Sequence, residues 1–96
     1  MIELLSDEEV KEFTEVLKIL SNPARLKLLN LLSRGEFTVS ELCEETNLKQ
    51  SLVSQQLKNL RLNNIVDRRK EAPRVYYKLK EERIIKFMKC IKKCGK

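Results

Sequence analysis

Apolar residues recur at helical spacing along most of the chain, and the first such stretch begins at a capping signal. Ser6 fits an N-cap, and the residues that follow place Val10, Phe13, Leu17 and Leu20 three and four positions apart. This spacing predicts a helix over about 7–20 that buries one apolar face.

The second apolar stretch begins at Asn22-Pro23, which combines an N-cap with proline at the first helical position. The helix is expected to end near Ser33, with Gly35 as a left-handed stop. Its leucines point in several directions, which predicts a helix at the centre of the fold. They are Leu26, Leu28, Leu29, Leu31 and Leu32.

Two short helices follow, joined by a tight turn. A capping box over residues 38–41 starts a helix at about 39–46, and Asn47 is suited to a left-handed cap. A further helix is expected over 50–62, with Val53, Leu57 and Leu60 directed inward. Such a pair predicts a helix-turn-helix.

Strand-like alternation begins after this pair. Residues 65–70 and 74–79 are predicted to form a hairpin with Pro73 at its tip, because proline cannot donate to a strand ladder. A last helix is predicted over about 81–94. The order is therefore ααααββα, mainly α with a small β-hairpin wing, and residues 1–96 form a single winged helix-turn-helix domain.

Composition narrows the class of protein. The 96 residues are 42% hydrophobic and 35% charged, with only two glycines and two prolines, which favours a small helical domain. No apolar run approaches the roughly 20 residues of a membrane span, and the first residues lack a secretory pattern. We expect a cytoplasmic protein that makes no membrane contact, with its three cysteines reduced.

The chain contains no histidine and no glycine-rich phosphate loop. Histidine is the commonest general base and a frequent zinc ligand, so its absence argues against catalysis and against an ordinary zinc site. We expect that the protein is not an enzyme and that it requires no cofactor.

Positive charge is concentrated in the predicted helix-turn-helix and wing. Residues 49–80 hold nine basic and two acidic side chains, whereas residues 1–48 hold five basic and ten acidic ones. A basic helix and hairpin are typical of a surface that binds a nucleic acid. The candidate base-reading residues are Gln50, Ser51, Ser54 and Gln55. The candidate phosphate contacts are Lys49, Lys58, Arg61, Arg68, Arg69, Lys70 and Arg74.

Other interpretations of these side chains exist. The polar residues of helix 50–62 could be an ordinary solvated face, and a winged helix with a basic patch could instead bind an acidic protein partner. The basic hairpin beside a helix with small polar side chains favours double-stranded DNA over both.

Four segments together resemble the ArsR/SmtB family of winged-helix repressors. They are Asn22-Pro-Ala-Arg-Leu-Lys-Leu-Leu29, Thr38-Val-Ser-Glu-Leu42, Gln50-Ser-Leu-Val-Ser-Gln-Gln-Leu57-Lys-Asn-Leu-Arg61 and Arg74-Val-Tyr-Tyr-Lys-Leu79. The resemblance covers about residues 10–90. It implies a homodimer built from the first and last helices, a near-palindromic operator contacted by residues 50, 51, 54 and 55, and repression relieved by an inducer.

The chain departs from the family pattern at two positions. Lys49 stands where serine or aspartate usually caps the helix, and Asn64 stands where glycine usually follows it. Loss of the cap costs about 1 kcal/mol, but a lysine there could contact a phosphate. Asparagine tolerates the left-handed conformation, so the fold should not change.

The inducer is left open by the sequence. Thr38 and Ser40 occupy the positions of a family Cys-x-Cys metal site, which leaves only Cys43 nearby. Cys90 and Cys94 lie four apart on the last helix and could ligate a soft metal or arsenite, or act as a thiol-redox switch. The alternatives are that these cysteines only pack, or that the protein binds DNA constitutively and has no sensor.

Overall fold

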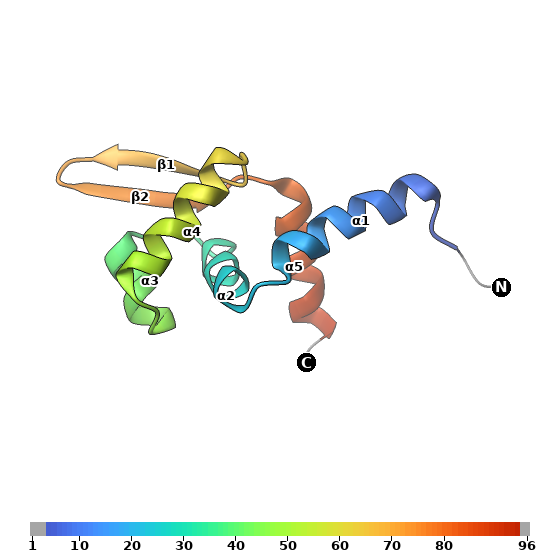
Figure 1. The fold of residues 1–96 in the computed structure, drawn as a ribbon, viewed down its shortest axis with the longest axis horizontal. Coiled ribbons are helices and arrows are strands. Elements are labelled where there is room, and N and C mark those ends of the chain that lie inside the picture. The colour runs from blue at the N-terminus through green and yellow to red at the C-terminus, as the bar shows by residue number, and fades with distance from the viewer. Residues whose placement is uncertain (1–3, 95–96) are drawn as a thin grey trace.

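The structure, a computed structural model, describes residues 4–94, and the side chains of residues 4–90. Figure 1 shows the predicted order of five helices and one hairpin. The elements are α1 (Asp7–Leu20), α2 (Pro23–Leu32), α3 (Val39–Thr46), α4 (Gln50–Leu62), β1 (Val66–Glu71), β2 (Arg74–Leu79) and α5 (Glu82–Cys94). The fold class predicted from the sequence is confirmed, and β1 lies one residue later than expected.

The helix starts follow the predicted caps. Ser6 and Glu9 form a capping box at α1, with the amide of Glu9 donating to Ser6 Oγ at 3.1 Å. Thr38 and Glu41 do the same at α3, and Asn22 accepts the amide of Arg25 at α2. Each cap satisfies backbone N–H groups that otherwise lack a partner at a helix start.

The turn between α3 and α4 depends on a left-handed residue. Asn47 has φ 65°, as the sequence predicted, and its amide donates to the carbonyl of Cys43. Beside it the buried Thr46 hydroxyl donates to the carbonyl of Leu42 and accepts the amide of Leu48. These bonds fix the direction in which α4 leaves α3.

Replacing Asn47 with alanine should destabilise the protein by roughly 1–2 kcal/mol, because a Cβ without a local polar group disfavours the left-handed region. Asn47→Gly is the matched control, since glycine adopts this conformation freely, and it should retain nearly all the stability. Urea unfolding followed by circular dichroism measures both. Equal midpoints for the alanine variant and the wild type would show that the turn does not depend on this conformation.

The core lies around α2, which Figure 1 shows between the α3–α4 pair and the two helices α1 and α5. The structure confirms the expected central position, because Leu28 and Leu29 are fully buried and Leu32 nearly so. Every other element from α1 to α5 contributes to the same cluster. Its further members are Val16, Leu20, Leu42, Val53, Leu57, Leu60, Ile65, Val66, Leu79, Ile84 and Met88.

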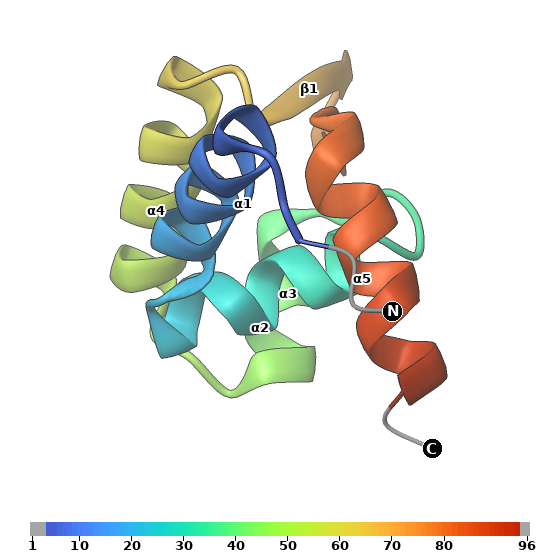
Figure 2. The ribbon, with the colours of Figure 1, turned by 90° about the vertical axis from the view of Figure 1, so that its right-hand side faces the viewer.

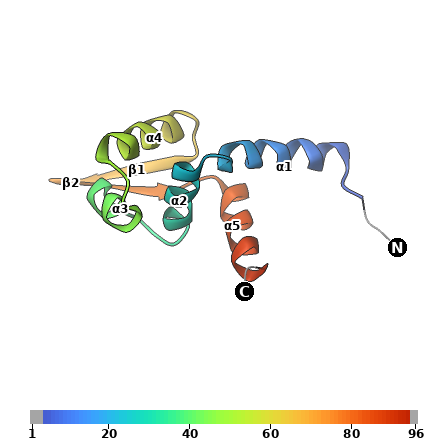
Figure 3. The same ribbon diagram turned by 60° about the horizontal axis from the view of Figure 1, so that its bottom comes forward.

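The predicted burial of the first helix is wrong for most of its length. Val10, Phe13 and Leu17 are 47%, 41% and 53% exposed, and Leu20 is the only one of the four expected residues that is buried. The reason is tertiary, because α1 projects away from the rest of the domain and packs mainly through its last turns (Figures 1 and 3). We call Val10, Phe13 and Leu17 the α1 stripe.

Gly35 does not end the second helix in a left-handed conformation, because no glycine in the described residues has a positive φ. Instead α2 ends at Leu32, and the amide of Ser33 donates to the carbonyl of Leu29. At the end of α4, by contrast, Asn64 adopts φ 60°, as expected of an asparagine in place of the family's glycine.

The hairpin is a two-stranded antiparallel sheet with a third short pairing at its edge. Arg69 lies opposite Tyr76, and Arg68 lies opposite Tyr77. Phe37, from the loop between α2 and α3, forms a bridge to Tyr77 on the outer edge of β2, with N–O distances of 3.0 and 2.8 Å. We call residues 66–79 the wing.

Candidate nucleic-acid interface

Helix α4 separates its side chains into a buried and an exposed face. Val53, Leu57 and Leu60 are at most 1% exposed and hold the helix against the core. The predicted base-reading side chains all lie on the solvent side. They are Gln50, Ser51, Ser54 and Gln55, and Lys58 is exposed with them. The helix therefore presents small polar groups that can pair with base edges in a major groove.

The start of α4 is open to an anion. Lys49 occupies the N-cap position without a side-chain hydrogen bond to the helix, as expected from its lack of an acceptor. The first-turn amides and the positive end of the helix are available to a phosphate, and the exposed lysine adds a full charge at the same place. Lys49 therefore provides no capping hydrogen bond to α4, but it places a positive charge where a phosphate can bind.

Two polar residues of α4 are less exposed than the predicted base-reading side chains. Arg61, a predicted phosphate contact expected to point largely outward, is half-buried near the end of the helix. Gln56 is also half-buried, and its Oε1 atom is buried without a hydrogen-bond partner in the described structure. Neither residue is as available to DNA as Gln50 or Gln55.

The basic residues of the wing lie on both faces of the hairpin. Arg68 and Lys70 are paired with Tyr77 and Val75, and side chains of paired residues share a face. Arg69 lies on the opposite face with Tyr76, and all three basic side chains are exposed.

Of the wing's exposed cations, Arg69 is already bonded to acidic side chains. Its guanidinium pairs with Glu36 at 2.8 Å and with Glu71 at 2.6 Å, and it lies 4.7 Å from the ring centroid of Tyr76. The hydrogen bonds to Glu71 and then Glu36 raise the pKa of Arg69. Glu36 was not predicted as a partner of Arg69, because the two residues are 33 positions apart in the chain.

The three cysteines occupy different environments. Cys43 is partly buried and packs against the core cluster, whereas Cys90 is exposed on α5. Cys94 ends α5, and its side chain lies outside the described residues. Within residues whose side chains are described, no group of three or more His, Cys, Asp or Glu residues could hold a metal ion.

Cys90 lines a groove of about 250 Å³ between α1 and α5. The groove is mostly apolar, with Phe13, Val16 and Phe87 in its walls and charged groups around them. The remaining lining residues are Glu12, Arg83 and Lys86.

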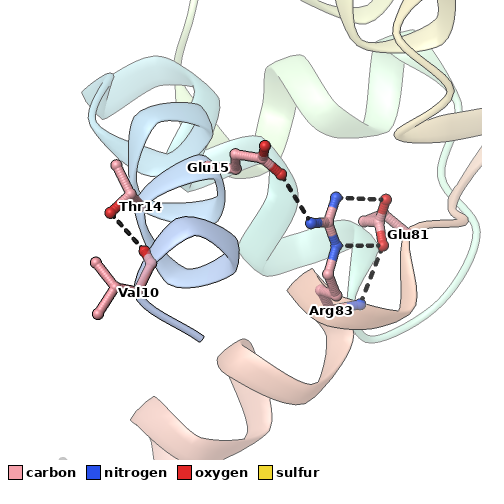
Figure 4. A network of polar contacts seen from close by, with 5 residues as sticks. All are labelled: Val10, Thr14, Glu15, Glu81 and Arg83. Carbon is pink, nitrogen blue, oxygen red and sulfur yellow. Dashed lines mark hydrogen bonds and ion pairs between the residues drawn. The ribbon is translucent and has the colours of Figure 1, made fainter. Parts of the chain in front are cut away.

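One arginine connects the two helices beside this groove (Figure 4). Arg83 donates from Nη1 to Glu15 on α1 at 3.2 Å and from Nε to Glu81 at 3.0 Å. The side-chain hydrogen bond from Arg83 holds the pKa of Glu81 below its ordinary value, so the carboxylate stays ionised to lower pH than a free glutamate does. The link was not predictable, since 68 positions separate Arg83 from Glu15.

A helix-turn-helix with an exposed polar second helix, flanked by a basic wing, defines a winged-helix DNA-binding domain. A profile described as bacterial regulatory protein, arsR family, matches residues 22–68. The biofilm growth-associated repressor of Agrobacterium fabrum is 38% identical over 88% of this chain and 73% of its own length. The arsenical resistance operon repressor of Staphylococcus xylosus is 39% identical over 75% of this chain and 69% of its own.

The fold is also similar to that of a relative whose structure has been solved. The crystal structure of the transcriptional repressor BigR from Xylella fastidiosa superposes with a TM-score of 0.80 at 34% identity, covering 88% of this chain and 87% of that one. The chain belongs to the ArsR/SmtB family of winged helix-turn-helix transcriptional repressors. It is a DNA-binding regulator and not an enzyme. No helix in the described part of the chain is long and apolar enough to cross a membrane.

Proposed function

We propose that this protein is a homodimeric, cytoplasmic repressor that binds a near-palindromic operator through α4. The observation that carries the proposal is the division of α4 between a fully buried apolar face and an exposed face with Gln50, Ser51, Ser54 and Gln55. A helix packed in this way is rigid, and it offers amide and hydroxyl groups that pair with base edges.

Phosphate contacts would fix the register of the helix in the groove. Lys49 and Lys58 flank the base-reading residues on α4, and the wing adds Arg68, Lys70 and Arg74. Each contact releases condensed counterions, so the affinity should fall steeply as salt rises. Arg61 and Arg69 are weaker candidates, since the first is half-buried and the second is bonded to two carboxylates.

The α1 stripe supports the homodimer. Three large apolar side chains on one projecting helix are unfavourable in water, and the adjoining α1–α5 groove is also apolar. A second copy related by a two-fold axis would cover both surfaces. Such a dimer could present its two α4 helices to major grooves about 34 Å apart.

Titration of the full-length protein against its operator and against random duplex DNA, at several salt concentrations, tests the function. We expect binding to both at low salt, a steep salt dependence and a strong preference for the operator. Absence of binding to any duplex at low salt would favour the rival function, a winged-helix module that binds an acidic protein.

We further propose that Cys90, together with Cys94, is the site at which a soft metal, arsenite or an oxidant relieves repression. Cys90 is exposed in the α1–α5 groove, so a thiophilic ion or an oxidant can reach its sulfur. A modified thiol there would change the packing of the proposed dimer. Cys43 packs against the core and is a weaker candidate.

Arsenite or oxidant treatment should weaken operator binding of the wild type at least about tenfold, which corresponds to roughly 1.4 kcal/mol. A Cys90→Ser/Cys94→Ser variant should bind the operator equally in treated and untreated forms. Cys43→Ala is the matched control and should respond like the wild type. Equal affinity of the wild type in every state would identify a constitutive DNA binder without a sensor.

A further inference from the structure

Arg69 has a bonding pattern unlike that of a free phosphate-binding arginine. Its Nε and Nη2 atoms donate to the same oxygen of Glu36, at 3.2 and 2.8 Å, and its Nη1 atom donates to Glu71 at 2.6 Å. The guanidinium also lies over the ring of Tyr76, 4.7 Å from the centroid. Each terminal nitrogen therefore has a carboxylate partner, and one face of the group is covered by an aromatic ring.

The strand register shows what this side chain connects. Arg69 belongs to β1 and is paired with Tyr76 of β2, so to reach Glu36 its side chain crosses over β2. Glu36 precedes Phe37, which bridges to Tyr77 at the outer edge of β2. The guanidinium thus links β1 to the loop between α2 and α3, which lies on the other side of β2.

That loop leads directly into the helix-turn-helix. Phe37 is followed by Thr38, the N-cap of α3, whose capping box fixes the start of the helix. A contact that holds Glu36 against the wing therefore sets the wing's position relative to α3 and, through the fixed turn, to α4. The buried Val66 and Leu79 hold the base of the wing, and the two hydrogen bonds of the Phe37 bridge hold β2 at Tyr77. The pair of Glu36 with Arg69 adds a restraint one position nearer the tip of the hairpin.

Charge also argues against a direct phosphate role. Arg69 is matched by two carboxylates, so the cluster carries a net negative charge, and withdrawing the guanidinium would expose both to the DNA. Arg68 and Lys70, its neighbours on the opposite face, have no ion-pair partner among the described side chains. They can approach a phosphate without breaking an existing pair.

We propose that Arg69 is a positioning residue: bound to Glu36 across Tyr76, it sets the wing against the helix-turn-helix, while Arg68 and Lys70 contact the phosphates. The inference rests on the proposed DNA-binding function. It adds a role for Glu36, an acidic residue beside the DNA-binding surface, in the preference for the operator over random DNA.

Glu36→Gln distinguishes a purely electrostatic effect of Glu36 from a role in positioning the wing, because the two predict opposite changes in operator affinity. Removing a negative charge near DNA should strengthen binding to every duplex if electrostatics alone matters. If Glu36 positions the wing, the variant should instead bind the operator about three- to fivefold more weakly, the range expected for loss of a partly exposed ion pair, without weaker binding to random duplex. Operator affinity equal to or above that of the wild type would overturn the proposal.

Arg69→Gln and Arg68→Gln form a matched pair on opposite faces of one strand. The slope of log affinity against log salt should fall by about 1.8 for Arg68→Gln, as for one lost phosphate contact in each half of the dimer, and should not change for Arg69→Gln. The double variant Glu36→Gln/Arg69→Gln should bind the operator no more weakly than the weaker single variant, because both remove the same link. A reduced slope for Arg69→Gln would assign it to a phosphate and overturn the positioning role.

Amide hydrogen exchange in the free protein separates this inference from the proposed function. The amides of Phe37 and Tyr77 should exchange faster in Glu36→Gln, because the bridge loses its support, while the core amides of α2 do not change. If the wild type binds no duplex, the proposed function fails, and the exchange rates still decide the structural link. Unchanged exchange at both amides would overturn it.

Discussion

A Gln50→Ala/Gln55→Ala variant should lose most of its preference for the operator over random DNA. Both side chains are exposed on the solvent face of α4, and a glutamine can make a bidentate pair with adenine. Each lost base contact should cost roughly 1–3 kcal/mol, so the pair should cost roughly 2–6 kcal/mol per half-site. Competition titrations at one fixed salt concentration measure the ratio of the two affinities.

The fold should survive this change, because the buried face of α4 is untouched and alanine is a good helix former. Lys58→Gln, on the same helix, is the matched comparison. It should weaken binding to all duplexes about equally and reduce the salt slope by about 1.8, which is about 0.9 for each half of the dimer. A Gln50→Ala/Gln55→Ala variant that still distinguished the operator as the wild type does would refute the assignment of α4 as the recognition helix.

Replacing Phe13 and Leu17 with glutamine should convert the proposed dimer into a monomer and abolish tight operator binding. Full burial of such a side chain contributes about 1.5–3 kcal/mol, and a two-fold interface contains each residue twice. Since only about half of each of these two side chains is still exposed in one chain, the loss is roughly 3–6 kcal/mol, enough to weaken dimerisation by about two to four orders of magnitude. Sedimentation velocity at micromolar concentration, followed by operator titration, measures both effects.

Leu62→Gln is the control for this experiment. Leu62 is 67% exposed near the end of α4, so the same chemical change is made outside the α1 stripe. This variant should sediment like the wild type. Because Phe13 and Leu17 contribute little to the core of one chain, circular dichroism should show a folded monomer for the double variant. A wild type that sediments as a monomer would contradict the proposed assembly.

Local chemistry in the sequence was enough to predict the elements and their order. Capping boxes at residues 6–9 and 38–41, the Asn22 cap and the left-handed Asn47 are short-range signals, and the structure contains all of them. The division of α4 into two faces also follows from helical periodicity. The prediction of a left-handed stop at Gly35 was wrong, since a glycine after a helix permits a left-handed residue without requiring one.

The α1 stripe was misjudged for a different reason. Spacing of three and four residues predicts that Val10, Phe13 and Leu17 share a face, and they do, but it does not say what covers that face. The path of the chain after Leu20 directs α1 outward, which Figure 3 shows from the side, whereas in Figure 2 α1 faces the viewer. The stripe therefore stays exposed in one chain. A pattern of apolar residues indicates which face of a helix tends to be buried. The tertiary arrangement determines which element, if any, covers that face.

By itself, the sequence determined the winged helix-turn-helix, the polar face of its recognition helix and the family, because each depends on residues close together in the chain. Only the tertiary structure decided that Arg69 is bonded to Glu36, that Arg83 links α5 to Glu15, and that Cys90 opens into a groove beside Phe13. These contacts join residues dozens of positions apart. Charge and periodicity indicate which kinds of contact a side chain can make. The fold determines which of the possible partners lies close enough to make that contact.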